Sequence, residues 1–155
     1  MRLTLAAVLL GVMLAGSAGA AEPGIDVGGH AEHTLHLTAA DLKTLPQVSA
    51  DVSFETGHGQ QSGHYTGALL WDVVQKAGIA DTPGSNAKHH LQHAVLVTGR
   101  DGYEVAVAIG EIDPDFENKT ILLVDDGAEK GIRLIVPGDK KGGRAVRDVV
   151  RIEIE

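Results

Sequence analysis

Residues 48–55 alternate strictly between apolar and polar side chains, and this alternation restricts the fold of the chain more than any other feature. Val48, Ala50, Val52 and Phe54 share one face, and the residues between them are polar. A period of two places successive side chains on opposite sides of an extended backbone, so the segment predicts a half-buried β-strand. Further strands are expected at residues 33–37, 94–98, 103–109, 120–124, 132–136 and 146–154.

Two segments change to the helical period. Thr38 opens a Thr-x-x-Asp capping pattern, which predicts a short helix from Ala39 to about Leu45 that ends before Pro46. Residues 69–77 form an amphipathic helix followed by a glycine suited to its C-terminus. Turns or loops are expected at 56–63, 81–88, 100–102 and 137–143. Several short strands with two helices predict an α+β domain with a mainly antiparallel or mixed sheet.

The first twenty residues have the pattern of a signal peptide. Arg2 supplies a positive start, residues 3–15 are almost purely apolar, and Ala18-Gly19-Ala20 forms an A-x-A cleavage site. The apolar run is shorter than the roughly 20 residues that span a membrane, so we expect cleavage and no membrane span. The predicted organisation is a signal peptide at 1–20, a flexible lead-in at 21–32 and one domain at 33–155, in a periplasmic or secreted protein.

Composition excludes several classes of function. The net charge of −8 repels phosphate backbones, and an aromatic content of 3% offers few rings on which bases could stack, so we expect no nucleic-acid partner. The chain has no cysteine, which removes thiolate catalysis, cysteine-based zinc sites and disulfides. The P-loop, the G-x-S-x-G elbow and the H-E-x-x-H motif are all missing from the sequence.

Five local signatures occur in a characteristic order along the chain. They are Leu37–Pro46, Tyr65–Val74 with the following Ala77-Gly-Ile79, Asp101-Gly-Tyr103, Arg133–Gly138 and Gly143–Ile154. In this order they resemble the oxidoreductase molybdopterin-binding domain family, the fold of sulfite-oxidase-type enzymes, over residues 33–155. The resemblance implies an α+β fold, a molybdopterin cofactor and oxidoreductase activity.

Two features depart from the catalytic members of that family. Their molybdenum is bound by a cysteine thiolate from the segment that corresponds to residues 52–58, where this chain offers only Ser53, Glu55 or His58. A soft sulfur ligand tunes such a metal for oxo transfer, so ordinary sulfite-oxidase catalysis is not expected. The leader also has only Arg2, whereas folded holoproteins of the family leave the cytoplasm by a twin-arginine route.

A basic cluster near the C-terminus is the candidate ligand site. In the family the loop before the last strand meets the pterin phosphate, and here that loop carries Lys140, Lys141, Arg144 and Arg147, with Arg133 one strand earlier. Cations of this kind suit a phosphate or carboxylate, although a solvated surface loop would carry the same charges. The resemblance also places Asp101 and Tyr103 on the cofactor-facing side, while a hairpin turn and a strand start explain both residues equally.

Histidines supply a separate candidate site. His89, His90 and His93 form an H-H-x-x-H pattern whose imidazoles could bind a transition metal if the segment were helical. The segment is expected to be a loop, and surface histidines are then the alternative.

Three functions therefore remain open from the sequence. The first is an exported binding or accessory module that keeps the molybdopterin-domain scaffold and binds a small anionic ligand or an envelope protein. The second is an atypical molybdopterin-dependent oxidoreductase, and the third is a periplasmic histidine-based metal binder.

Overall fold

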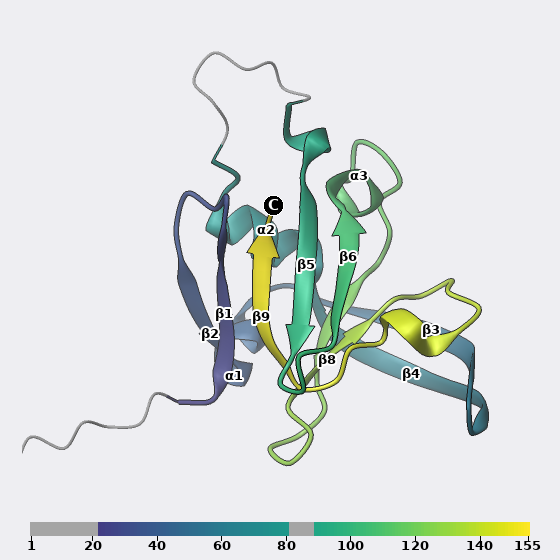
Figure 1. The fold of residues 1–155 in the computed structure, drawn as a ribbon. Helices are drawn as coiled ribbons and strands as arrows, with labels where there is room; N and C mark the ends of the chain where they lie inside the picture. The colour runs from purple at the N-terminus through teal and green to yellow at the C-terminus, as the bar shows by residue number, and fades with distance from the viewer. Residues whose placement is uncertain (1–21, 81–88) are drawn as a thin grey trace, which may run out of the picture.

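Two β-sheets form the frame of the computed structural model, which describes residues 22–80 and 89–155 (Figure 1). The first sheet has the order β2 (Leu35–Thr38), β1 (Gly24–Gly29), β9 (Val149–Ile154), β5 (Ala94–Gly99), β6 (Glu104–Ala108). The second has the order β3 (Gln47–Thr56), β4 (Gly59–Leu69), β7 (Leu122–Asp125), β8 (Ile132–Ile135). Among these strands β1 and β9 pair in parallel and the other pairs are antiparallel, so the predicted α+β fold with a mixed sheet is confirmed. The predicted signal peptide and the loop at 81–88 lie outside the described residues.

Strand β1 corrects one expectation, because residues 24–29 do not form a flexible lead-in. The strand lies inside the first sheet, antiparallel to β2 and parallel to β9. Ile25 and Val27 are fully buried on its inner face. Gly29 has a φ of 78°, and a Cβ atom there would collide with the carbonyl oxygen of Ile154. The alternation Ile25-Asp26-Val27 is too short to separate a strand from a loop by periodicity.

Helices α1 (Ala39–Thr44) and α2 (Leu70–Ala77) occur where the sequence predicts them. The Thr38 side chain accepts a hydrogen bond from the Asp41 N–H at 3.2 Å, and the Asp41 carboxylate accepts one from the Thr38 N–H at 2.8 Å. This capping box satisfies donors that an open helix end would leave unpaired. The sequence did not predict α3 (Ile109–Ile112) or the two 3-10 turns, η1 (His89–Gln92) and η2 (Gly142–Arg144).

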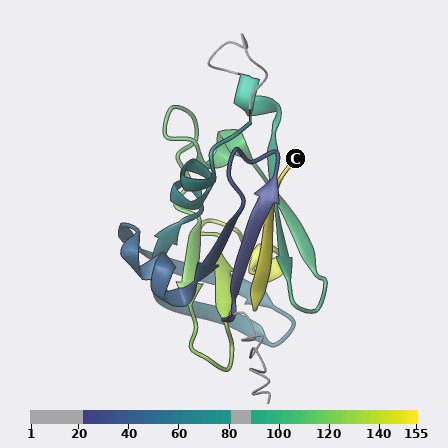
Figure 2. The same cartoon turned by 90° about the vertical axis from the view of Figure 1, so that its left-hand side faces the viewer.

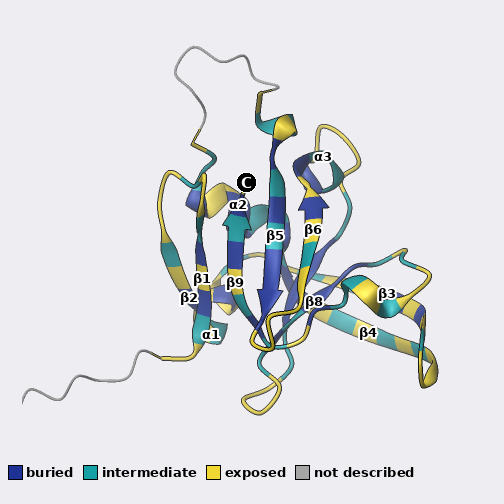
Figure 3. Ribbon diagram, viewed as in Figure 1, coloured by how far each residue is buried: buried dark blue, intermediate teal, exposed yellow. Residues whose placement is uncertain are grey.

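Helix α2 packs its apolar face on the inner side of the first sheet (Figure 2). Leu70, Val73, Val74 and Ala77 are fully buried there, and Trp71 lies at the edge of the same cluster. Buried residues line the inner sides of the strands, and exposed ones gather at turns and on outer faces (Figure 3). In the described part of the chain, no helix is long and apolar enough to cross a membrane.

The β3–β4 hairpin extends beyond the first sheet and carries a smaller core of its own (Figure 1). Val52 and Phe54 on β3 pack with residues of β7 and β8. The predicted turn at 56–63 is shorter in the structure, because pairing continues to Thr56 opposite Gly59. The hairpin therefore presents one apolar side to the body of the protein next to β8.

Candidate functional site

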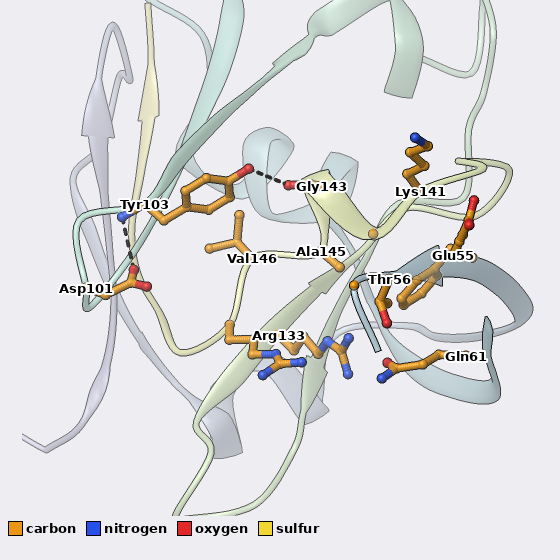
Figure 4. A pocket seen from close by; sticks show the side chains of 14 residues that line it. Glu55, Thr56, Gln61, Asp101, Tyr103, Arg133, Lys141, Gly143, Ala145 and Val146 are labelled. Carbon is orange, nitrogen blue, oxygen red and sulfur yellow. Dashed lines mark hydrogen bonds between the residues drawn. The ribbon is translucent and has the colours of Figure 1, made fainter. Parts of the chain in front are cut away.

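A cavity of about 660 Å³ opens where the β3–β4 hairpin meets β8, the Asp101–Tyr103 turn and the chain from 141 to 147. Its lining carries three cations, Arg133, Lys141 and Arg147. Figure 4 shows Arg133 and Lys141 on opposite sides of this cavity, with the chain between Gly143 and Val146 passing between them. The fold thus brings together basic residues from a core strand and from the loop that precedes the last strand.

Arg133 on β8 is held by aromatic contacts. Its guanidinium carbon lies 6.0 Å from the centre of the Phe54 ring and 5.7 Å from that of Tyr65. Both distances are within the range of a cation–π interaction. Its Nε atom is buried and has no hydrogen-bond partner among the described residues. Buried polar groups are normally hydrogen-bonded, so this unpartnered donor is unusual, and it belongs to a residue that also lines the cavity.

The opposite wall is fixed by hydrogen bonds around Tyr103. The Tyr103 N–H donates to Asp101 Oδ1 at 3.0 Å, and the Tyr103 hydroxyl donates to the Gly143 carbonyl oxygen at 2.8 Å. Gly142 lies so close to the Phe54 ring that a Cβ atom would come within 2.9 Å of it. These contacts bind the β5–β6 turn to η2 and η2 to β3. The Tyr103 side chain remains 52% exposed, so its ring can contact a bound molecule.

Arg144, one of the predicted anion ligands, is already occupied by acidic side chains and does not line the cavity. Its Nε and Nη2 atoms donate to Asp139 at 2.9 and 2.7 Å, and Nη1 donates to Glu111 at 3.2 and 3.4 Å. The hydrogen bonds from Arg144 to Asp139 raise the pKa of the guanidinium, despite its partial burial. Arg144 therefore connects the loop at 137–147 to α3.

Glu111 is the other centre of this ion-pair network. Burial by itself raises the pKa of its carboxyl, but hydrogen bonds from Lys119, Arg144 and the Ala108 N–H outweigh that effect and hold the pKa below its ordinary value. Lys119 Nζ lies 2.7 Å from Glu111 Oε1. The Glu111 carboxylate thus caps α3 and forms ion pairs with Lys119 and Arg144, so its role is structural.

Lys140 also lies outside the cavity lining, and its backbone carbonyl accepts a hydrogen bond from the Glu55 N–H at 2.9 Å. Lys141, which follows it, lines the cavity and is exposed. Of the predicted site residues, the structure brings together Arg133, Arg147, Asp101 and Tyr103, and it directs Lys140 and Arg144 elsewhere.

Asp148 has a positioning role that the sequence does not reveal. Its φ is 46°, which is uncommon for a residue other than glycine. Arg100 holds it twice, through an Nε–Oδ2 contact of 2.6 Å and a backbone hydrogen bond from its N–H to the Asp148 carbonyl oxygen at 2.9 Å. This bend immediately follows Arg147 and sets the direction in which that residue enters the cavity.

The three histidines of the alternative metal site do not converge. His89 contacts Gln92, His90 Nε2 lies 2.7 Å from Asp113 Oδ2, and His93 Nδ1 lies 2.9 Å from the Glu155 carbonyl oxygen. Within residues 22–80 and 89–155, no group of three or more His, Cys, Asp or Glu side chains could hold a metal ion. The expected loop is a 3-10 turn, η1, but its histidines serve separate contacts.

The donors at residues 52–58 do not fit the molybdenum site that the resemblance implies. Ser53 is exposed, and its hydroxyl lies 2.9 Å from the Ser62 hydroxyl. His58 is an exposed residue of the hairpin turn, and of the three candidate donors Ser53, Glu55 and His58 only Glu55 lines the cavity. The only sulfur-containing residues of the chain are Met1 and Met13, which precede the described residues. The cavity therefore offers cations and a phenol ring, but no soft ligand.

A solved structure shares this architecture. It is the crystal structure of the sulfane dehydrogenase SoxCD from Paracoccus pantotrophus, which matches with a TM-score of 0.65 and 18% sequence identity. The chain has a sulfite-oxidase-like fold. The match covers 84% of this chain and 37% of the dehydrogenase chain, so this chain spans little more than a third of that enzyme's length. At this identity the likeness establishes the fold alone.

The sulfite-oxidase-like fold was predicted from five short signatures, and that prediction is confirmed. No protein-family model matches the chain, and no curated protein sequence matches it. Function must therefore be argued from the cavity itself.

Proposed function

We propose that this protein is an exported binding module that uses a sulfite-oxidase-like fold to hold a small anionic molecule. The ligand lies against Arg133 and Arg147, with Lys141 at the cavity rim. The protein acts without a molybdenum cofactor, as a carrier or accessory component in the cell envelope. The signal-peptide pattern at 1–20 supports the location, and the cavity supports the binding role.

The observation that carries the proposal is the state of Arg133. Its guanidinium is packed against two aromatic rings, and its buried Nε atom lacks a hydrogen-bond partner in the described part of the chain. An arginine whose rotamer is fixed in advance loses little conformational entropy when it binds a planar anionic group. An acidic side chain could have occupied this donor, as Asp139 does for Arg144, but none does among the described residues.

The charge and size of the cavity agree with a small anion. The protein has a net charge of −8, yet the cavity lining holds three cations against two acids, Glu55 and Asp101. Asp101 Oδ1 already accepts the Tyr103 N–H. A volume of about 660 Å³ is typical of small-molecule sites, which range from about 300 to 1,000 Å³.

Thermal unfolding at constant ionic strength tests this function. Phosphate, sulfate and acetate are added in turn, and one that reaches a hundred times its Kd should stabilise the protein by about 2.7 kcal/mol. For a domain of this size the melting temperature then rises by about 10 °C. The double variant Arg133→Gln/Arg147→Gln should lose this rise.

A matched double variant controls for the loss of two charges. Arg151→Gln/Lys76→Gln removes the same net charge, with Arg151 on β9 and Lys76 exposed on α2, neither of them in the cavity lining. This control should keep the full ligand-induced rise. Equal responses of wild type, site variant and control would show that the cavity does not bind these anions.

Protein purified from the native cell envelope tests export and the cofactor together. Intact mass should correspond to a chain that begins near Ala21, and elemental analysis should find no stoichiometric molybdenum. A molybdenum-to-protein ratio near one would replace this proposal with an atypical molybdopterin-dependent oxidoreductase. A mass that still includes residues 1–20 would contradict export by a cleaved signal peptide.

A further inference from the structure

The two arginines of the proposed site also line a second cavity. This cavity has a volume of about 310 Å³, and its lining consists of Asp126, Lys130, Arg133 and Arg147. Because Arg133 and Arg147 belong to both linings, they stand at the junction of the two spaces. One space leads from this junction to Lys141, and the other leads to Lys130.

We propose that the ligand is an elongated polyanion whose charged groups occupy both cavities, an inference that rests on the anion-binding function proposed above. One anionic group lies at the two arginines, and a second lies in the smaller cavity beside Lys130. The class of compound is a condensed phosphate or a dicarboxylate, which carries at least two anionic groups. Phosphate and sulfate, in contrast, each carry a single anionic group.

The charges of the smaller cavity support this assignment. It holds three cations against one acid, whereas the larger cavity holds three cations against two acids. The smaller cavity is thus the more positive one, although it is less than half as large. A single-centred anion at the two arginines would leave the exposed Lys130 ammonium to water and Asp126, whereas a ligand with a second anionic group can also pair with Lys130.

The walls of the smaller cavity differ in rigidity. Arg133 is fixed by its aromatic contacts, and Asp148 and Arg100 fix the backbone next to Arg147. Lys130 belongs to the turn between β7 and β8, where its N–H donates to the Gly127 carbonyl oxygen at 3.1 Å. A lysine on such a turn can follow anionic groups at different distances from the arginines, since its long side chain carries a compact charge. We therefore expect the affinity to depend less on the length of the polyanion than on the presence of its second anionic group.

Calorimetric titration of the mature protein at fixed ionic strength tests the inference. Phosphate, pyrophosphate and tripolyphosphate form one series, and acetate and succinate form a second that separates phosphate from carboxylate chemistry. One of the two series is expected to bind more tightly. In that series, the ligand with more than one anionic group should bind at least about tenfold more tightly than the single-group ligand. Lys130→Gln should remove about tenfold of the affinity for the larger ligand and change that for phosphate or acetate by less than about twofold.

Lys76→Gln is the matched control, because it removes the same charge from an exposed position on α2. It should leave every affinity within about twofold of wild type. If phosphate binds but tripolyphosphate and succinate bind no more tightly than phosphate and acetate, the polyanion inference is wrong and the anion-binding function stands. The polyanion inference is equally wrong if Lys130→Gln and Lys76→Gln behave alike. If no anion of either series binds, both proposals fail.

Discussion

Removal of the Arg144 guanidinium should destabilise the protein without acting through the ligand. Arg144→Met keeps an unbranched apolar stem but removes the guanidinium, which leaves the carboxylates of Asp139 and Glu111 without this cation. The side chains of these three residues are only 20–28% exposed, so the stranded charges are poorly hydrated. The variant also loses the tie between α3 and the loop that forms one wall of the cavity.

The contacts in the structure set the expected size of the effect. An exposed ion pair is worth less than about 1 kcal/mol, and breaking a fully buried pair costs about 3–5 kcal/mol. Arg144 makes a bidentate contact with Asp139 at 2.7–2.9 Å and a longer one with Glu111 at 3.2–3.4 Å. With about a quarter of each side chain exposed, we expect a loss of about 2 kcal/mol, or about 8 °C in melting temperature.

The assay is thermal and urea unfolding of Arg144→Met beside Arg151→Met. Arg151 has the same charge but is 55% exposed, and its Nε lies 3.8 Å from Glu153. The control should lose less than about 0.5 kcal/mol. If the two variants unfold at the same temperature, Arg144 is not a structural tie and the reason for leaving it out of the ligand site disappears.

Two further predictions concern the same part of the fold. Because the pKa of Glu111 lies below its ordinary value of 4.5, its contribution to stability is complete above about pH 4.5 and is lost as the pH falls through its folded pKa. In acid titrations followed by circular dichroism, Arg144→Met should therefore lose less stability than wild type as the pH falls below about 4.5. Asp148→Val should be destabilised by about 1–3 kcal/mol in urea unfolding and should bind anions more weakly, because a β-branched residue resists a positive φ that Asp148→Asn tolerates. Both substitutions remove the carboxylate that pairs with Arg100, so similar results for the two would mean that the positive-φ bend does not position Arg147.

Elements defined by local chemistry could be predicted from the sequence. The strict alternation at 48–55 gives β3, and the Thr-x-x-Asp pattern gives the cap of α1, because in each case neighbouring residues supply the determining interactions. Strand β1 was missed because only Ile25 and Val27 mark it, and its stability comes from pairing with β9 at the far end of the chain. The order of strands in a sheet is set by such long-range pairing, which no local pattern encodes.

The composition of the candidate site was only partly predictable for a related reason. Charge density in the sequence finds the basic segment but does not show which cations already have acidic partners. Asp139 lies five residues before Arg144 and Glu111 lies on a separate helix, and the fold uses both to neutralise that arginine. What sets Arg147 apart from the other basic residues of the segment is the bend at Asp148. That bend depends on Arg100, which follows a different strand.

The same fold also explains how the cavity that we propose binds an anion can exist without a metal ligand. Two of the three candidate donors in the segment at which the resemblance places the ligand, Ser53 and His58, are exposed, on the outer side and at the tip of the β3–β4 hairpin. A change of side chain there costs the fold little. Arg133 instead extends from β8 over the rings of Phe54 and Tyr65, so its replacement would leave aromatic surface uncovered next to the smaller core. The absence of a metal ligand on the hairpin and the presence of Arg133 on β8 are therefore structurally independent.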